Sequence, residues 1–173
     1  ATLSPLSREV SVNERSKFPP VFWVANGIEV LERFAYYGIY FGFPIYFKQA
    51  GHADSLGTVQ TFFLLLSYFL PVFSGTLADR YGFKRMLIAS YLLYLPAISL
   101  LIFFKTFSGI VLAMLTVGLA AGTFKPLISG TVRTVTDKSN TTVGFGIFYA
   151  MVNIGGTFGP MVMGNLRATS WDQ

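Results

Sequence analysis

Three charged side chains, Glu29, Glu32 and Arg33, interrupt an apolar stretch that is otherwise long enough to cross a membrane. Each charge costs about 2.5–3.5 kcal/mol near the centre of a bilayer, so a sequence keeps three of them only where they are used or paired. Their i, i+3, i+4 spacing places them on one face of a helix. That face continues through four further polar side chains: Asn26, Tyr36, Tyr37 and Tyr40. The pattern predicts one wall of a polar cavity within a membrane.

A second cation, Lys125, lies inside another apolar segment, in LAAGTFKPLISG. Together with Glu29, Glu32 and Arg33 it gives a charge sum of zero, which a low-dielectric interior favours. We therefore expect Lys125 to lie near Glu29 or Glu32, and the two segments to face each other. No metal-ligand spacing accompanies these charges.

Two interpretations of this charge network are open. It is either a structural ion cluster that fixes helix register, or a proton-coupling site, because a buried carboxylate that loses its cationic partner takes up a proton. The number of charges and the adjacent tyrosines favour proton coupling. We expect Glu32 to exchange the proton, because it lies outside the i, i+4 pair of Glu29 and Arg33 and its partner is easier to lose.

The composition predicts the elements that position these residues. Apolar residues make up 53% of the chain and charged residues only 12%, which is about half the usual share for a soluble domain. Five segments approach or exceed the ~20 residues needed to span a membrane: 21–47, 58–78, 86–104, 107–132 and 143–166. Because the links between them are short, we expect an all-α integral membrane protein, an antiparallel bundle of five transmembrane helices.

Lysine and arginine residues predict the orientation of the bundle. Eight of them lie in the N-terminal tail and in the second and fourth links, whereas three lie on the other side. The positive-inside rule then places the N-terminus in the cytoplasm, with residues 1–19 as a cytoplasmic tail and residues 20–173 as the membrane bundle. The net charge of +5 is accordingly a membrane-orientation signal, and no nucleic-acid partner is expected.

The chain has few residues suited to enzymatic chemistry. It has no cysteine and a single histidine, His52, which excludes thiolate metal sites and any arrangement that needs two histidines. No catalytic triad or phosphate-binding loop is present in the sequence. We therefore expect neither catalytic residues, nor a cofactor, nor an enzyme.

The second link, in GTLADRYGFKR, resembles the loop between helices 2 and 3 of the major facilitator superfamily. The residues that match the gating-loop pattern are Gly75, Leu77, Asp79, Arg80, Gly82, Lys84 and Arg85. We expect Gly82 to permit a tight reversal and Asp79 to end the preceding helix. In the family this loop latches a cytoplasmic gate. A plain positive-inside hairpin accounts for the basic residues but not for Asp79 with both glycines.

Three further motifs resemble the proton-dependent oligopeptide transporter family. They are ExxERFxYYG at residues 29–38, the lysine and proline of GTFKP at residues 122–126, and FYxxxNxG at residues 148–155. The resemblance implies symport of protons with di- and tripeptides or other small polar solutes. It also implies proton-coupling roles for Glu29, Glu32, Arg33 and Lys125. The residues it implies for the substrate pocket are Tyr36, Tyr37 and Asn153, beside Asn26 and Tyr40 from the polar face.

The resemblance predicts the N-terminal half of a proton-coupled secondary transporter, without the sixth helix of that half. Because such a transporter needs two six-helix halves around a site at the membrane midplane, a five-helix chain cannot perform alternating access by itself. The alternative is a truncated, transporter-like chain that acts as a structural subunit of a larger membrane complex. The partners expected are protons, a small polar solute and the lipid bilayer, with other membrane subunits in the alternative.

Overall fold

The computed structural model describes residues 18–104 and 106–171, with no side-chain description after residue 168. Over these residues the chain forms five α-helices, which confirms the all-α membrane bundle. They are α2 (Pro20–Gln49), α3 (Ala53–Tyr81), α4 (Phe83–Phe103), α5 (Phe107–Thr134) and α6 (Thr141–Trp171). The predicted tail of residues 1–19 lies almost entirely outside the described residues.

The links between the helices are as short as the sequence predicts. Gly82 alone joins α3 to α4, and its φ of +91° lies in the region that glycine adopts without a steric cost. The expectation that Asp79 ends the preceding helix is wrong, because α3 continues to Tyr81 and the glycine ends it. The helices also extend past most ends of the predicted apolar segments, since polar residues continue them beyond the hydrocarbon core.

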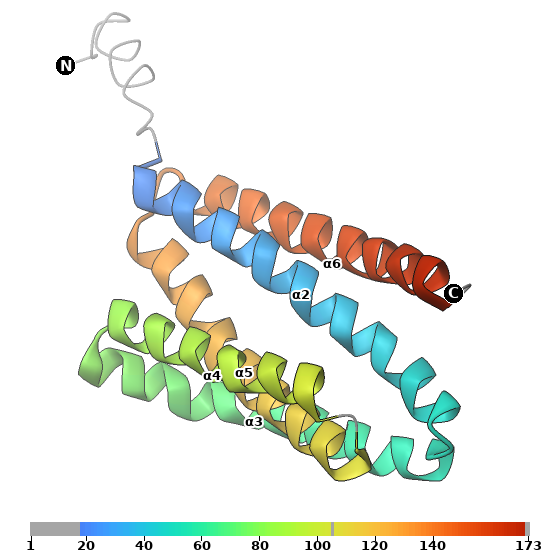
Figure 1. Ribbon diagram of the computed structural model, residues 1–173. Coiled ribbons are helices and arrows are strands. Elements are labelled where there is room, and N and C mark those ends of the chain that lie inside the picture. Colours follow the sequence, from blue (N-terminus) through green and yellow to red (C-terminus); the bar gives the residue numbers. More distant parts are fainter. Residues whose placement is uncertain (1–17, 105, 172–173) are drawn as a thin grey trace, which may run out of the picture.

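The packing pairs helices that are distant in sequence. α2 packs chiefly along α6, whereas α5 packs against both α3 and α4. Figure 1 shows that α2 and α6 run side by side in the same direction, as do α3 and α5. Short links therefore reverse the chain at each turn, but among successive helices only α4 and α5 pack extensively within the described residues.

Glycines explain these two parallel pairs. A Cβ on Gly159 of α6 would lie 2.2 Å from the carbonyl oxygen of Phe34 on α2, and one on Gly155 would lie 2.5 Å from that of Val30. Between α5 and α3, a Cβ on Gly122 would similarly lie 2.6 Å from the carbonyl oxygen of Leu66. Both small-xxx-small pairs of the sequence, 118–122 and 155–159, therefore lie at helix contacts where the backbones approach closely.

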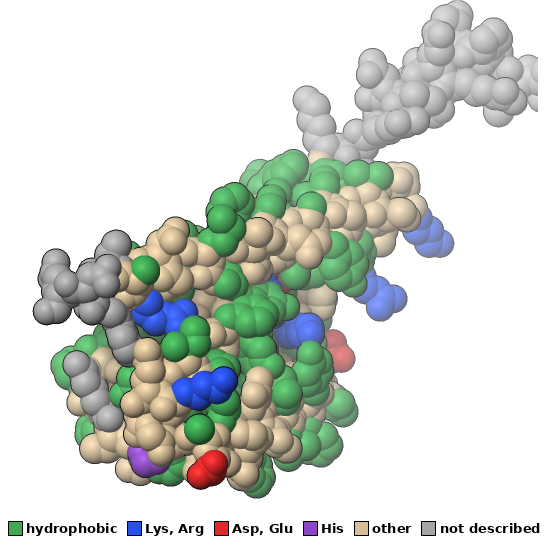
Figure 2. Space-filling model, turned by 90° about the vertical axis from the view of Figure 1, so that its right-hand side faces the viewer, with side chains coloured by type: hydrophobic (Ala, Val, Ile, Leu, Met, Phe, Trp, Pro, Cys, Tyr) green, Lys and Arg blue, Asp and Glu red, His purple; other side chains and the backbone are tan. Residues whose placement is uncertain are grey.

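Four helices, α3 to α6, have the length and apolar composition to cross a membrane. α2 has the length but carries Glu29, Glu32 and Arg33 in its middle. Many large apolar side chains face outward, including Leu65, Phe73 and Leu92, each more than half exposed. On the face shown in Figure 2, the few charged side chains are scattered among hydrophobic ones. Such a surface suits lipid or another membrane-embedded protein rather than water.

Two apolar clusters of the core leave a polar level between them. One cluster gathers Phe22 and Ala25 of α2 with Phe124 and Ile128 of α5. The other begins at Tyr36 of α2 and continues along that helix to Phe47. The charges at positions 29, 32 and 33 therefore lie between two apolar layers, where few water molecules can reach them.

The close approach of α2 and α6 predicts the effect of a single added methyl group. Gly159→Ala should lower the free energy of unfolding by about 1–3 kcal/mol, because the new Cβ meets the backbone of α2, which cannot move aside as a side chain can. Gly146→Ala on the same helix is the matched control, since nothing lies within 4 Å of its added Cβ. Thermal unfolding of the two variants in detergent measures the difference. Equal midpoints would contradict this account of the packing.

Candidate functional site

A buried charge cluster forms the centre of the site. Glu29, Glu32 and Arg33 of α2 are 3%, 4% and 5% exposed. The Arg33 Nε donates a hydrogen bond of 2.5 Å to Glu32 Oε2 and lies 3.3 Å from Glu29 Oε1. The Arg33 Nη2 also lies 2.5 Å from Glu32 Oε2, as an ion contact without hydrogen-bond geometry. One guanidinium therefore pairs with two carboxylates.

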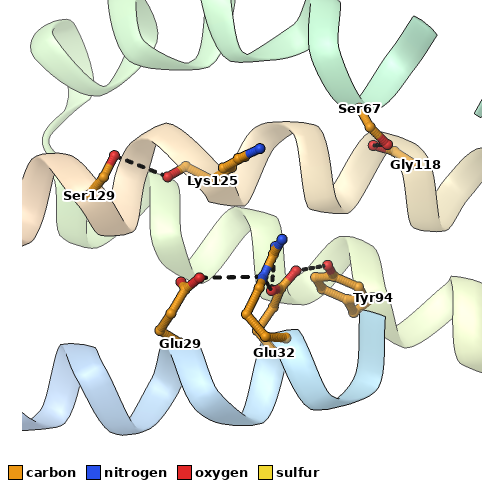
Figure 3. Close-up of polar contacts among 8 residues, drawn as sticks. Glu29, Glu32, Ser67, Tyr94, Gly118, Lys125 and Ser129 are labelled. Carbon is orange, nitrogen blue, oxygen red and sulfur yellow. Dashed lines mark hydrogen bonds and ion pairs between the residues drawn. The ribbon is translucent and has the colours of Figure 1, made fainter. Parts of the chain in front are cut away.

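The two carboxylates are not equivalent. Glu32 receives a second donor, the Tyr94 hydroxyl of α4, on its other oxygen, Oε1. Glu29 has the longer contact to Arg33, and its Oε2 is buried without a hydrogen-bond partner. Figure 3 shows both carboxylates on α2 and Tyr94 reaching Glu32 from α4. The expected order is thus reversed, because Glu32 is the better-paired carboxylate and Glu29 is the one whose partner is easier to lose.

A small cavity of about 100 Å³ adjoins the cluster. Its lining comes from α2, α3 and α5 and is mostly polar or aromatic: Arg33, Tyr36, Tyr37, Tyr40, Leu64, Ser67, Tyr68, Ala121 and Lys125. The Arg33 Cζ lies 4.8 Å from the centre of the Tyr36 ring, and the Lys125 Nζ lies 5.2 Å from that of Tyr68. The cavity therefore has two cations held against aromatic rings.

Lys125 does not form the ion pair with Glu29 or Glu32 that the sequence predicts. It lies on α5, across from the carboxylates, as Figure 3 shows. Among the described residues, however, both carboxylates pair with Arg33, and neither lies within ion-pair distance of Lys125. The exposed Lys125 side chain instead lines the cavity. α2 and α5 both line this cavity, and a proton-coupling role for Lys125 stays a prediction.

The predicted pocket residues divide into two groups. Tyr36, Tyr37 and Tyr40 of α2 line the cavity, with the Tyr36 and Tyr40 rings stacked and the Tyr37 ring edge-on to Tyr36. Asn26 lies beside the apolar cluster that contains Phe22 and Ala25, and its Nδ2 donates a hydrogen bond of 2.8 Å to the carbonyl oxygen of Phe22. Asn153 is exposed on α6 and its Nδ2 donates to the carbonyl oxygen of Tyr149. The two asparagines therefore do not line this cavity.

Three residues of the site were missed by sequence reasoning: Ser67, Tyr68 and Tyr94. Ser67 and Tyr68 interrupt the apolar run LLLSYFLP of α3, and Tyr94 interrupts YLLYLP of α4. Ser67 donates to the carbonyl oxygen of Gly118 across the α3–α5 contact. A polar residue inside an apolar helix was the available signal, but the sequence alone does not show which neighbour it faces.

The residues predicted to form a gating loop gather at the α3–α4 reversal. Asp79 and Arg80 at the end of α3, and Lys84 and Arg85 at the start of α4, are all exposed around Gly82. Gly75 lies within α3, and nothing comes within 4 Å of a Cβ added there. A latch to a second domain requires such an exposed set, so gating stays a prediction for these residues.

The chemistry available at this site is ion binding and proton exchange. Within residues 18–104 and 106–171, no group of three histidine, cysteine or acidic side chains could hold a metal ion. The two cations and the phenols can bind an anionic group, because guanidinium and ammonium donors pair with carboxylates and phenol rings provide flat contact surfaces. The carboxylates beside them can hold a proton.

Comparison with known proteins gives matches to membrane transport families. A family model described as Major Facilitator Superfamily matches residues 27–172. The chain is 31% identical to Dipeptide and tripeptide permease A of Klebsiella pneumoniae (strain 342) over 172 residues, covering 95% of this chain and 33% of that protein. It is 28% identical over 128 residues to Quinolone resistance protein NorA of Staphylococcus aureus (strain MRSA252), covering 73% of this chain and 33% of that protein.

The chain thus spans about a third of the length of the curated relatives it matches. No solved structure gives a significant match. The family model extends over the helices that carry the charge cluster and the cavity.

The shared guanidinium predicts unequal costs for removing the two cations. Arg33→Gln should lower the free energy of unfolding by about 3–5 kcal/mol, because it leaves two buried carboxylates without a cation. Lys125→Gln is the matched control and should cost less than about 1 kcal/mol, because its exposed ammonium makes no ion pair with them. Denaturant titration in detergent measures both values. A cost for Lys125→Gln as large as that for Arg33→Gln would refute the pairing described.

Proposed function

Because this chain belongs to the Major Facilitator Superfamily, we propose that it forms the N-terminal half of a proton-coupled secondary transporter for a small, carboxylate-bearing solute such as a peptide. Membership of the family supports a multi-pass membrane protein that transports small solutes. The observation that carries the proposal is the small polar cavity, which Arg33 and Lys125 both line while Arg33 also holds two buried carboxylates.

The cavity favours a solute with a carboxylate. Arg33 and Lys125 bring positive charge to the cavity from two different helices. The Arg33 Nη2 lies 2.5 Å from Glu32 Oε2 without hydrogen-bond geometry, so a solute carboxylate would compete with Glu32 for this donor. Tyr36, Tyr40 and Tyr68 supply aromatic surfaces beside the cations. A short peptide offers a terminal carboxylate for the cations and side chains for the rings.

Proton coupling follows from the sharing of Arg33. A solute carboxylate that draws the guanidinium toward the cavity weakens its 3.3 Å contact with Glu29 before its shorter contact with Glu32. Glu29 is then a buried anion without a partner, and such a group binds a proton from the water in the open cavity. When the solute leaves on the other side, Arg33 returns and the proton is released. Solute and proton then cross together.

The relatives give independent support for a peptide solute. The permease of Klebsiella pneumoniae is named for dipeptides and tripeptides, and its match extends over 95% of this chain. The quinolone resistance protein matches a shorter part, 73% of the chain. Because the permease matches a larger share of the chain, peptides are the first solutes to test, and a quinolone is the comparison.

The orientation that accompanies this proposal places the N-terminus in the cytoplasm. The exposed basic residues Arg80, Lys84 and Arg85 around Gly82 then lie on the cytoplasmic side, as the positive-inside rule requires. A loop with exposed Asp79 and exposed basic residues on that side is suited to latch a cytoplasmic gate through reversible ion pairs. The His52 link lies on the opposite side.

Uptake of a labelled dipeptide into proteoliposomes that contain the complete protein tests the proposal. An inward proton gradient should drive accumulation, and excess unlabelled dipeptide should compete with the label. Glu29→Gln should reduce gradient-driven accumulation by about tenfold or more while exchange across equal pH continues, because exchange needs the cavity but no net proton movement. Asp54→Asn is the matched control, a carboxylate that is exposed at the start of α3.

Three outcomes would contradict the proposal. If the Glu29→Gln variant accumulates dipeptide as well as the unmodified protein does, proton coupling does not depend on Glu29. Competition by a quinolone but not by peptides would reassign the solute. A protein that transports none of these solutes and purifies only with partner membrane proteins would favour a structural subunit.

A further inference from the structure

The Tyr94 side chain connects α4 to α2, although the backbones of these two helices are not in contact. α4 packs against α3 and α5, and the backbones of α2 and α4 do not approach each other in the described part of the chain. The Tyr94 hydroxyl nevertheless donates a hydrogen bond from α4 to Glu32 Oε1 on α2. Tyr94 is 7% exposed and packs in the apolar cluster that contains Tyr36 and Ala97. Its hydroxyl therefore reaches out of an apolar layer into the charge cluster.

Several ionisable groups surround Glu32, and Tyr94 is the one that fixes its second oxygen. α2 contributes Glu29 and Arg33, α4 contributes Tyr91 and Tyr94, and α5 contributes Lys125 at longer range. Arg33 binds Oε2 of Glu32 and Tyr94 binds Oε1, so both oxygens have a donor. Among the described residues, Glu29 has no second donor, and its Oε2 has no hydrogen-bond partner.

We propose that Tyr94 of α4 is a positioning residue for Glu32 of α2. Its hydrogen bond keeps Glu32 in the carboxylate form, so that Glu29 alone exchanges protons. Hydrogen bonds donated to a carboxylate favour its charged form, and Glu32 has two where Glu29 has one ion contact. The coupling part of this inference rests on the proposed transport function. The contact also ties α2 to the α3–α4–α5 group of helices at the level of the charges, so a shift of α4 would release Glu32.

Carbodiimide labelling with peptide mass spectrometry tests the positioning without any transport measurement. Dicyclohexylcarbodiimide reacts with protonated carboxyl groups in apolar surroundings. In the unmodified complete protein, Glu29 should be labelled about tenfold faster than Glu32, since a hydrogen bond to a charged group has about this effect. Tyr94→Phe should raise the labelling of Glu32 by about tenfold. Tyr91→Phe is the matched control, because this tyrosine of the same helix lies near the carboxylates but makes no hydrogen bond to them in the described part of the chain, and it should change the labelling of Glu32 far less than Tyr94→Phe does.

Double variants test whether Tyr94 acts through Glu32 during transport. Tyr94→Phe should lower gradient-driven accumulation in the unmodified background and should have no further effect in a Glu32→Gln background, because the acceptor is already changed. The same loss in both backgrounds would overturn the proposal, as would unchanged labelling of Glu32 in Tyr94→Phe. Equal labelling of Glu29 and Glu32 in the unmodified protein would also overturn it, even if Tyr94→Phe does not fold. A lack of accumulation by the unmodified protein would instead reject the proposed transport function, and the labelling would still decide the role of Tyr94.

Discussion

Arg33 is a single guanidinium placed between two carboxylates in the buried middle of a helix bundle. Burial makes an unpaired carboxylate expensive, so the position of Arg33 sets the energy of both Glu29 and Glu32. With one cation for two anions, α2 keeps a net negative charge at this level. In the described part of the chain, the cations that line the cavity are Arg33 itself and Lys125. Any group that competes for Arg33 therefore changes the energy of a carboxylate several ångströms away. This is the physical basis for linking solute to proton.

The rest of the bundle holds that cluster in place. Apolar clusters lie on both sides of it along α2, so water enters chiefly through the cavity. Gly155 and Gly159 bring α6 onto the backbone of α2, directly beside Val30 and Phe34, and this contact restrains the turn of helix that carries Glu29 and Arg33. Tyr94 connects the same turn to α4 from the other side. The charge cluster thus lies between a tightly packed helix pair and a three-helix group, and a movement between those two parts would act on it first.

Much of this arrangement can be predicted from the sequence, and the rest depends on tertiary packing. Apolar run length predicts the helices, and Gly82 between two apolar segments predicts the tight reversal, because both signals are local. The spacing of Glu29, Glu32 and Arg33 predicts a polar face because helix periodicity is fixed. The partners of that face are not local: Lys125 lines the cavity instead of forming a salt bridge, and Tyr94 binds Glu32 from a helix whose backbone does not touch α2. Short links predict the α4–α5 contact but not the main partner of α2, because glycine contacts, not chain connection, decide that α2 packs on α6.

Solute-driven proton entry is the most direct measure of the central claim, that binding at the cavity changes the protonation of the buried carboxylates. A pH-sensitive dye enclosed in proteoliposomes of the complete protein reports it, with no proton gradient applied and a dipeptide gradient directed inward. If solute competes for Arg33 and thereby loads Glu29, dipeptide addition acidifies the interior, and Glu29→Gln abolishes the acidification while dipeptide still enters. Dipeptide entry at the same rate without any change of internal pH in the unmodified protein would contradict the claim and leave the cluster a structural ion pair.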